Sequence, residues 1–202
     1  GRHGRRWVSR AGRNILASVV IEQGQPALAA EAVTIAAGVA IAEGVQDACG
    51  ADCRLKWPND VLLEEGKLAG VLVEAFTTKH GAWLVVGFGV NVGEAPPRDA
   101  VDRPAASLRA SAGQAVERIE VLRSVLVRLD AWVAAIAGGQ FEALHEAWAG
   151  RCGMINQRVT VQSQGRLVTG RVLDVSPLEG LVLACDSGQT VTLQAATSTI
   201  VG

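Results

Sequence analysis

The sequence predicts an α/β (α+β) fold, with a mixed, mainly antiparallel sheet packed against helices and a small β-barrel after it. Short β-branched, apolar runs separated by turn residues recur along most of the chain, as they do in strands joined by hairpins. Longer segments instead carry apolar residues at helical spacing. The length of 202 residues is enough for one medium domain and one small one.

The chain begins with a predicted strand and helix. Residues 14–22 are β-branched and apolar and lie between Gly12 and Gly24, which favours a buried strand. An alanine-rich segment at 26–47 has apolar residues at helical spacing and is followed by Gly50. We therefore expect a helix that packs on a sheet.

A series of strands follows. The hydrophobic pattern predicts them at 53–56, 61–63, 68–76 and 81–92. A turn at 64–66 joins the second and third strands as a hairpin. The proline-rich segment 94–103 is predicted to be a loop, because proline fits neither a sheet ladder nor a helix interior.

Two helices and a domain boundary come next. Residues 117–137 predict an amphipathic helix that Gly138 ends, and residues 141–149 predict a shorter one. The glycines Gly150 and Gly153 mark the boundary between a first domain, 1–152, and a second, 153–202.

The second domain shows only short strands with frequent turns. They are expected at 158–163, 167–175, 181–185, 190–194 and 199–201. A small β-barrel of about 45 residues fits this spacing.

Composition excludes several classes of protein. The net charge of -1 argues against a nucleic-acid or membrane-surface binder, and no leader or charge-free apolar run of about 18 residues is present, so we expect a cytoplasmic protein. Four scattered cysteines do not have zinc-site spacing and are interpreted as reduced thiols. The chain starts at Gly1 and its only methionine is Met154, so we expect an upstream segment to be missing.

The first candidate motif is the glycine- and arginine-rich start, GRHGRRW, at residues 1–7. Glycines allow backbone N–H groups to turn toward an anion, and guanidinium groups bind phosphate or carboxylate oxygens in pairs. A solvated basic tail is the alternative.

The second motif is Lys56-Trp57-Pro58-Asn59-Asp60, followed by Lys67. It lies at the end of a predicted strand, where scaffolds present site residues, although Pro58-Asn59-Asp60 is also a good turn. Lys67 enters an otherwise apolar strand, so it is either an edge residue that reaches solvent or a positioned charge.

The third motif is Gly87-Phe88-Gly89-Val90-Asn91, a strand with alternate glycines. Alternate glycines clear one face of a strand, so that a flat group can lie against the backbone; a bulge or close helix packing is the alternative.

Together, these motifs and the intervening Ser9, Gly12, Asn14 and Ser18 resemble the biotin protein ligase family across essentially the whole chain. The resemblance implies that ATP and magnesium serve to convert biotin to biotinyl-adenylate, which a lysine of a biotin carboxyl carrier protein then captures. It also implies an SH3-like C-terminal barrel and allows a homodimer. From the net charge of -1 we expect no binding to nucleic acid by this chain.

The resemblance also implies roles for individual residues. Lys67 and Arg2 are the implied catalytic residues. Biotin and phosphate binding is implied for Gly1, Arg2, His3, Gly4, Arg5, Lys67, Gly87 and Gly89. ATP binding is implied for Trp7, Lys56, Asn59, Asp60 and Asn91, with Asp60 also the candidate magnesium ligand.

Two alternative functions stay open at this point. A lipoate or octanoate protein ligase would share the architecture, but KWPND and GRHGRRW argue against it. A fragment that binds a carrier domain without catalysis is the other, because the family's upstream segment, which supplies much of the biotin contact, is not present. The isolated His3, His80 and His145 are interpreted as structural.

Overall fold

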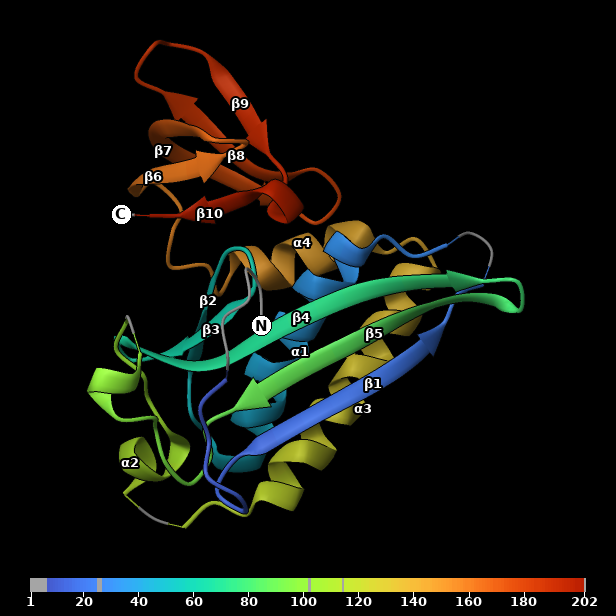
Figure 1. The fold of residues 1–202 in the computed structure, drawn as a ribbon, viewed down its shortest axis with the longest axis vertical. Helices are drawn as coiled ribbons and strands as arrows, with labels where there is room; N and C mark the ends of the chain where they lie inside the picture. Colours follow the sequence, from blue (N-terminus) through green and yellow to red (C-terminus); the bar gives the residue numbers. More distant parts are fainter. Residues whose placement is uncertain (1–6, 25–26, 102, 114, 202) are drawn as a thin grey trace.

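The computed structural model describes residues 7–24, 27–101, 103–113 and 115–201. Two five-stranded antiparallel sheets form its framework, one in each half of the chain. In the first sheet the strand order is β1-β5-β4-β3-β2, and helices α1 and α3 cover one face of it (Figure 1). The second sheet lies at one end of the first, beside helix α4 (Figure 1). The predicted α/β arrangement with mainly antiparallel pairing is confirmed.

The strands of the first sheet follow the predicted pattern closely. They are β1 (Ile15–Glu22), β2 (Cys53–Lys56), β3 (Asp60–Leu63), β4 (Gly66–Thr78) and β5 (Gly81–Val90). Buried and exposed residues alternate along β1, as expected of a strand with only one face against a core. The face that lacks helices is called the outer face below.

Helices α1 (Ala30–Cys49) and α3 (Arg118–Ala137) pack side by side beneath the sheet. Gly44 allows this contact, since a Cβ there would lie 2.6 Å from the Val125 backbone nitrogen. Helix α1 ends at Gly50, whose left-handed backbone (φ 72°) lets its N–H donate to the Gln46 carbonyl oxygen. The amphipathic helix predicted at 117–137 is confirmed by α3.

Helix α1 is long and apolar enough to cross a membrane by length and composition alone. However, 67% of its apolar window is buried inside the structure, and the helix carries Glu31, Glu43 and Asp47. Burial against the sheet and α3 accounts for its apolar character, as in the core helix of a globular protein.

The proline-rich segment forms the predicted loop, with a 3-10 turn η2 (Arg98–Ala100) inside it. The short helix α2 (Leu108–Ala112) after the loop was not predicted, because five residues are too few to show a period. Helix α4 (Phe141–Ala149) has the predicted bounds.

The second sheet contains β6 (Arg158–Ser163), β7 (Arg166–Ser176), β8 (Gly180–Cys185), β9 (Thr190–Leu193) and β10 (Ser198–Ile200), with the 3-10 turn η3 (Ala195–Thr197) before β10. Its order is β10-β6-β7-β8-β9, so all five predicted strands are present. The pairing of β7 with β8 shifts register between Val172 and Asp174, which bends the sheet.

Polar contacts connect the C-terminal sheet and the segment before it to the first part of the chain. The His145 Nε2 atom on α4 lies 2.7 Å from Asp174 Oδ1 on β7. The Arg103 guanidinium donates to the Ile200 carbonyl oxygen of β10 at 2.8 Å. The buried side chain of Met154 accepts a hydrogen bond from the Trp57 backbone N–H. The C-terminal sheet is thus bonded directly to helix α4 and to the proline-rich loop.

Candidate active site

A cavity of about 670 Å³ lies on the outer face of the first sheet. Strands β1, β4 and β5 form its floor, residues 7–8 lie on one side and the loop 96–105 on the other. Polar lining residues are few: Ser18, Asn59, Asp60, Lys67, Asn91 and Arg103, together with the Trp7 indole. An apolar cavity with a small number of polar groups is the usual form of a small-molecule site.

Cross-strand pairing brings the predicted motifs into one row across the sheet. Its members, in order across the strands, are Lys56, Asp60, Gly70, Gly89 and Leu16. Residues that are separate in sequence therefore become neighbours, because paired residues on one face of a sheet lie about 5 Å apart. A second row of Leu72, Gly87 and Ser18 runs beside it.

Glycines clear the floor of the cavity. A Cβ at Gly89 would lie 2.6 Å from Trp7 Cε2, so the indole ring lies directly over this residue. A Cβ at Gly70 would lie 3.0 Å from Lys67 Nζ. A Cβ at Gly87 would have its nearest contact at 3.6 Å, from the Leu72 carbonyl oxygen, so a methyl group would make only ordinary van der Waals contact there. Gly87 and Gly89 thus clear the outer face of β5 as predicted, and the Trp7 indole lies over Gly89.

Trp7 has an unsatisfied donor. Its Nε1 atom is buried and has no hydrogen-bond acceptor within the described residues. Buried indole N–H groups usually have a partner. Because this atom has almost no accessible surface, a molecule in the cavity would reach it only if the indole or its neighbours moved.

Lys67 reaches the outer face because the strand is irregular. The register of β3 and β4 shifts between Val61 and Leu62, so that Leu62 pairs with Lys67 and Val61 with Ala69. The extra residue puts Lys67 on the same face as Gly70, whereas residues three apart in a regular strand face opposite sides. Of the two alternatives for this lysine, the structure supports a positioned charge.

The Lys67 ammonium group is fixed by a carboxylate. Its Nζ donates to Asp60 Oδ1 at 2.5 Å and lies 6.0 Å from the centroid of the Trp7 ring. The Lys67 and Asp60 side chains are only 32% and 17% exposed, so water screens this pair less than a surface ion pair. A cation is thereby held above the glycine floor.

Asn59 braces the turn that carries Asp60. Its Nδ2 donates to the Val71 carbonyl oxygen at 2.6 Å, while Val71 N–H donates to the Asn59 carbonyl oxygen at 3.0 Å. The turn is therefore bonded to β4 in both directions.

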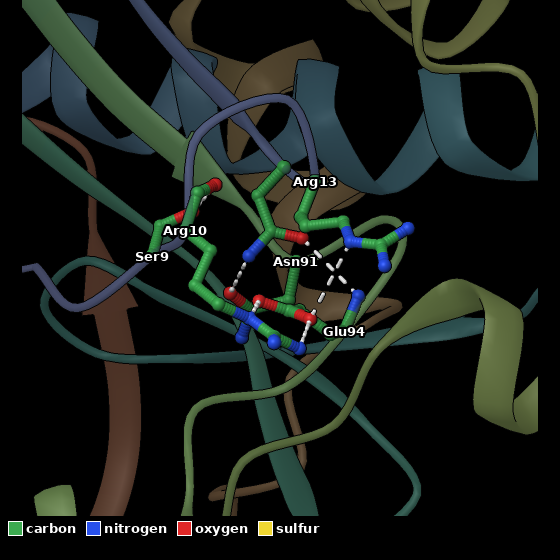
Figure 2. A network of polar contacts seen from close by, with 6 residues as sticks. Ser9, Arg10, Arg13, Asn91 and Glu94 are labelled. Carbon is green, nitrogen blue, oxygen red and sulfur yellow. Dashed lines mark hydrogen bonds and ion pairs between the residues drawn. The ribbon is translucent and has the colours of Figure 1, made fainter.

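Asn91 is a buried member of a polar network (Figure 2). It is 2% exposed; its Nδ2 donates to the Lys67 carbonyl oxygen at 3.3 Å, and its Oδ1 accepts from Asn14 Nδ2 at 3.5 Å. The Glu94 N–H donates to Asn14 Oδ1 at 3.3 Å. Within the described residues, Asn91 thus positions Lys67 from below.

Glu94 binds the arm that carries Trp7 to the proline-rich loop. Its carboxylate accepts hydrogen bonds from Arg10 and forms an ion pair with Arg13 Nε at 3.7 Å (Figure 2). The hydrogen bond from Arg10 lowers the pKa of Glu94, and the charge of Arg13 adds to the effect. Both segments that border the cavity are joined by this contact.

The predicted site residues fall into three groups. Those that line the cavity are Trp7, Asn59, Asp60, Lys67, Gly87, Gly89 and Asn91. Lys56 does not line it, but pairs with Asp60 in the adjacent strand. Gly1, Arg2, His3, Gly4 and Arg5 lie outside the described residues.

Sequence reasoning missed Arg103 and gave Ser18 no separate role. Arg103 was placed in a surface loop, and only its isolated positive charge among prolines could have indicated a site. Ser18 is a hydroxyl on an otherwise apolar part of the floor, beside Gly87.

The cysteines have the properties predicted for reduced thiols. All four are free, and burial raises the pKa of Cys53 to about 12 and that of Cys152 to about 11. These two thiols therefore stay protonated at neutral pH.

Comparison with known proteins shows the family of the chain. The sequence model of the biotin/lipoate A/B protein ligase family matches residues 1–91. A biotin–[acetyl-CoA-carboxylase] ligase of Paracoccus denitrificans is 32% identical over 95% of this chain and 82% of its own. The ligase of the same name from Mycobacterium tuberculosis is 34% identical over 96% of this chain and 72% of its own.

A solved structure shows the same fold. The biotin protein ligase of Aquifex aeolicus in complex with biotin and ATP superimposes with a TM-score of 0.87 at 23% identity, covering 100% of this chain and 83% of that one. Because the two relatives are 32% and 34% identical over most of their own length, the chain belongs to the biotin/lipoate A/B protein ligase family, whose model matches its first part. Within that family it stands with the biotin protein ligases, since both relatives carry that name over nearly its whole length.

Proposed function

We propose that the protein is an ATP-dependent ligase that activates biotin and transfers it to a lysine of a biotin carboxyl carrier protein. The single observation that carries this proposal is Lys67, which a bulged strand holds beside Asp60 above a floor of glycines. The names of the two relatives identify the acyl group and the class of acceptor.

The floor of the cavity suits the apolar part of biotin. Gly87 carries no side chain between Leu72 and Ser18, and Ser18 supplies one hydroxyl for a polar atom of the ligand. A flat bicyclic molecule could lie against β5 with its carboxylate directed toward Lys67.

The first chemical step builds charge next to Lys67. An oxygen of the biotin carboxylate attacks the α-phosphorus of ATP, and the bond from that phosphorus to pyrophosphate breaks. Lys67 stabilises the negative charge on the oxygens as it develops, and Asp60 and Asn91 keep the lysine in position beforehand. Such preorganisation costs no rearrangement at the moment of reaction.

The second step transfers the acyl group. The amine of the acceptor lysine attacks the acyl carbon of biotinyl-adenylate, the carbon–oxygen bond to AMP breaks, and the amine loses a proton. Trp7 and the loop at 96–105 border the cavity and reduce the access of water, which would otherwise hydrolyse the mixed anhydride.

Magnesium fits this site as an ion held mainly by phosphates. No group of three or more metal-binding side chains occurs in the described part of the chain, and Asp60 is the one carboxylate among the described lining residues. Magnesium is usually bound through one or two carboxylates together with substrate phosphates and water. It would neutralise the departing pyrophosphate.

We also propose that the C-terminal sheet curls into the SH3-like barrel predicted from the sequence, with the domain boundary near residues 152–153. The bulge at Val172 and Asp174 and the terminal positions of β9 and β10 in the sheet support this proposal. Cys152 still pairs with Leu55 of the first sheet, in agreement with that boundary.

The test is biotin-dependent exchange of labelled pyrophosphate into ATP by the purified chain, followed by addition of a carrier protein and detection of biotinylated lysine. We expect exchange with biotin and none with lipoate or octanoate. Exchange with lipoate instead of biotin would favour the lipoate ligase alternative. Carrier binding without any exchange would favour the non-catalytic fragment.

A further inference from the structure

Arg103 lies where the cavity meets the C-terminal sheet. It lines the cavity, and its Nη2 atom donates to the carbonyl oxygen of Ile200 at 2.8 Å. Ile200 is the last residue of β10 and is only 5% exposed. The Ile200 carbonyl oxygen of the C-terminal sheet therefore orients the Arg103 guanidinium at the edge of the cavity on the first sheet.

Backbone pairing places Arg103 close to Lys67. The Lys67 N–H donates to the Pro104 carbonyl oxygen at 2.9 Å, and the Ala106 N–H donates to the Lys67 carbonyl oxygen at 3.0 Å. Gly66 permits this close approach, since a Cβ there would lie 2.7 Å from the Ala106 nitrogen. Arg103, the residue before Pro104, is consequently held next to the start of β4.

Positive charge exceeds negative charge in this part of the site. Lys67 and Arg103 both line the cavity, while Asp60 supplies its only carboxylate within the described residues. Lys56 lies nearby: burial lowers its pKa, and the charge of Arg103 lowers it further. Among the described lining residues, one carboxylate therefore faces two cations, and an anion would balance this local excess of positive charge.

The free donors of Arg103 suit phosphate oxygens. A guanidinium has five N–H donors, and within the described part of the structure Arg103 uses one of them, in the bond to Ile200. Paired N–H donors bind phosphate oxygens in a bidentate manner, which an exposed lysine cannot do.

We infer that Arg103 binds the β- and γ-phosphates of the nucleotide, and that β10 of the C-terminal sheet holds it in position to do so. The inference rests on the proposed function for the identity of the anion. It gives the C-terminal sheet a part in nucleotide binding, through the Ile200 carbonyl oxygen.

The experiment measures binding rather than turnover. ATP and inorganic pyrophosphate, each with magnesium, are titrated calorimetrically into the full chain and into Arg103→Gln, Arg103→Lys and Arg109→Gln. Arg109 is an exposed arginine of α2 that does not line the cavity, so it controls for the loss of one positive charge. Thermal unfolding of each variant is recorded in parallel.

We expect Arg103→Gln to weaken both ligands about tenfold, the factor that one hydrogen bond to a charged group commonly provides. Arg103→Lys should be weakened less, and Arg109→Gln should match the wild-type chain. If Arg103 only attached the C-terminal sheet, Arg103→Gln would lower the unfolding temperature but leave both affinities unchanged, and the inference would be wrong.

The same titrations separate this inference from the proposed function. Loss of pyrophosphate affinity in Arg103→Gln, combined with no biotin-dependent exchange in the wild-type chain, would retain Arg103 as a phosphate-binding residue and overturn the ligase. A wild-type chain that binds neither ATP nor pyrophosphate would overturn the inference itself.

Discussion

The two ends of β4 differ in regularity, and the difference coincides with the candidate site. At the start of the strand, the register with β3 shifts, and Lys67 and Gly70 share the outer face. From Ala69 to Thr78 the strand pairs with β5 without interruption, and residues 74–78 are all exposed (Figure 1). The candidate site lies where the register shifts, because the extra residue there lets Lys67 and Gly70 face the same side of the strand.

The largest expected effect is that of Lys67→Ala, at the irregular end. We expect biotinyl-adenylate formation to fall by roughly a hundredfold or more, as for removal of a group that stabilises developing charge. The fold should persist, because the side chain bonds only to Asp60 in the described structure and is 32% exposed. Single-turnover kinetics and circular dichroism measure the two quantities.

Lys79→Ala, in the turn between β4 and β5, is the matched control. Lys79 is exposed and has no ion pair in the described structure, so adenylation should remain near the wild-type rate. Near-normal adenylation in Lys67→Ala would contradict the assigned role of Lys67.

Gly89→Ala should have the next largest effect. The added methyl group would lie 2.6 Å from Trp7 Cε2, so the indole must move, at a cost of about 1–3 kcal/mol. We expect adenylate formation to fall about tenfold, with a lower thermal midpoint. Gly87→Ala makes only ordinary contacts, so it should raise the KM for biotin without lowering the midpoint. Identical behaviour of the two variants would argue against the different roles given to these glycines.

Asn91→Ala tests the buried support of Lys67. It removes one of the two donors to the Lys67 carbonyl oxygen, which keeps its bond from the Ala106 N–H, and it removes the acceptor of Asn14 Nδ2. An unpaired buried polar group costs about 1–3 kcal/mol. Urea unfolding should show this loss, with a reduced rate of adenylation. Thr77→Ala, at the regular exposed end of β4, should change stability by less than about 0.5 kcal/mol. Equal midpoints for the two variants would refute the supporting role.

Glu94→Gln should have the smallest effect, and it depends on pH. The pKa of Glu94 is lower in the folded state, chiefly because of the Arg10 hydrogen bond, so its ion pairs stabilise the fold above the unfolded-state pKa. That contribution is lost as pH falls through the folded-state pKa. Acid unfolding of the variant, followed by circular dichroism at low salt, should therefore depend less steeply on pH than that of wild type. Glu74→Gln should leave the wild-type curve unchanged; a similar change there would indicate a general charge effect.

The elements of the fold could be predicted from the sequence because each has a strong local signal. The strand 53–56 and the helix 141–149 match the structure at both ends, since glycine and polar residues bound them clearly. Helix α1 starts at Ala30 rather than near residue 26, because proline permits a first helical turn without requiring one.

The geometry of the site could be predicted only in part. The motifs named Lys67, Asp60 and Trp7, but the bulge that turns Lys67 outward depends on how β3 pairs with β4. Arg103 was missed because its partner, Ile200, is 97 residues away in sequence. Contacts of this range leave no local pattern, so they require the tertiary structure.

The most direct test is a crystal structure of the full chain with a non-hydrolysable analogue of biotinyl-adenylate, which would show where the analogue binds. We expect the biotin ring to lie against Gly87, with the phosphate oxygens within hydrogen-bond distance of Lys67 Nζ. A second cavity, of about 520 Å³ and lined in part by Asp52, Glu146 and Arg151, provides a clear alternative. An analogue bound there, with the outer face of the sheet empty, would contradict the central claim.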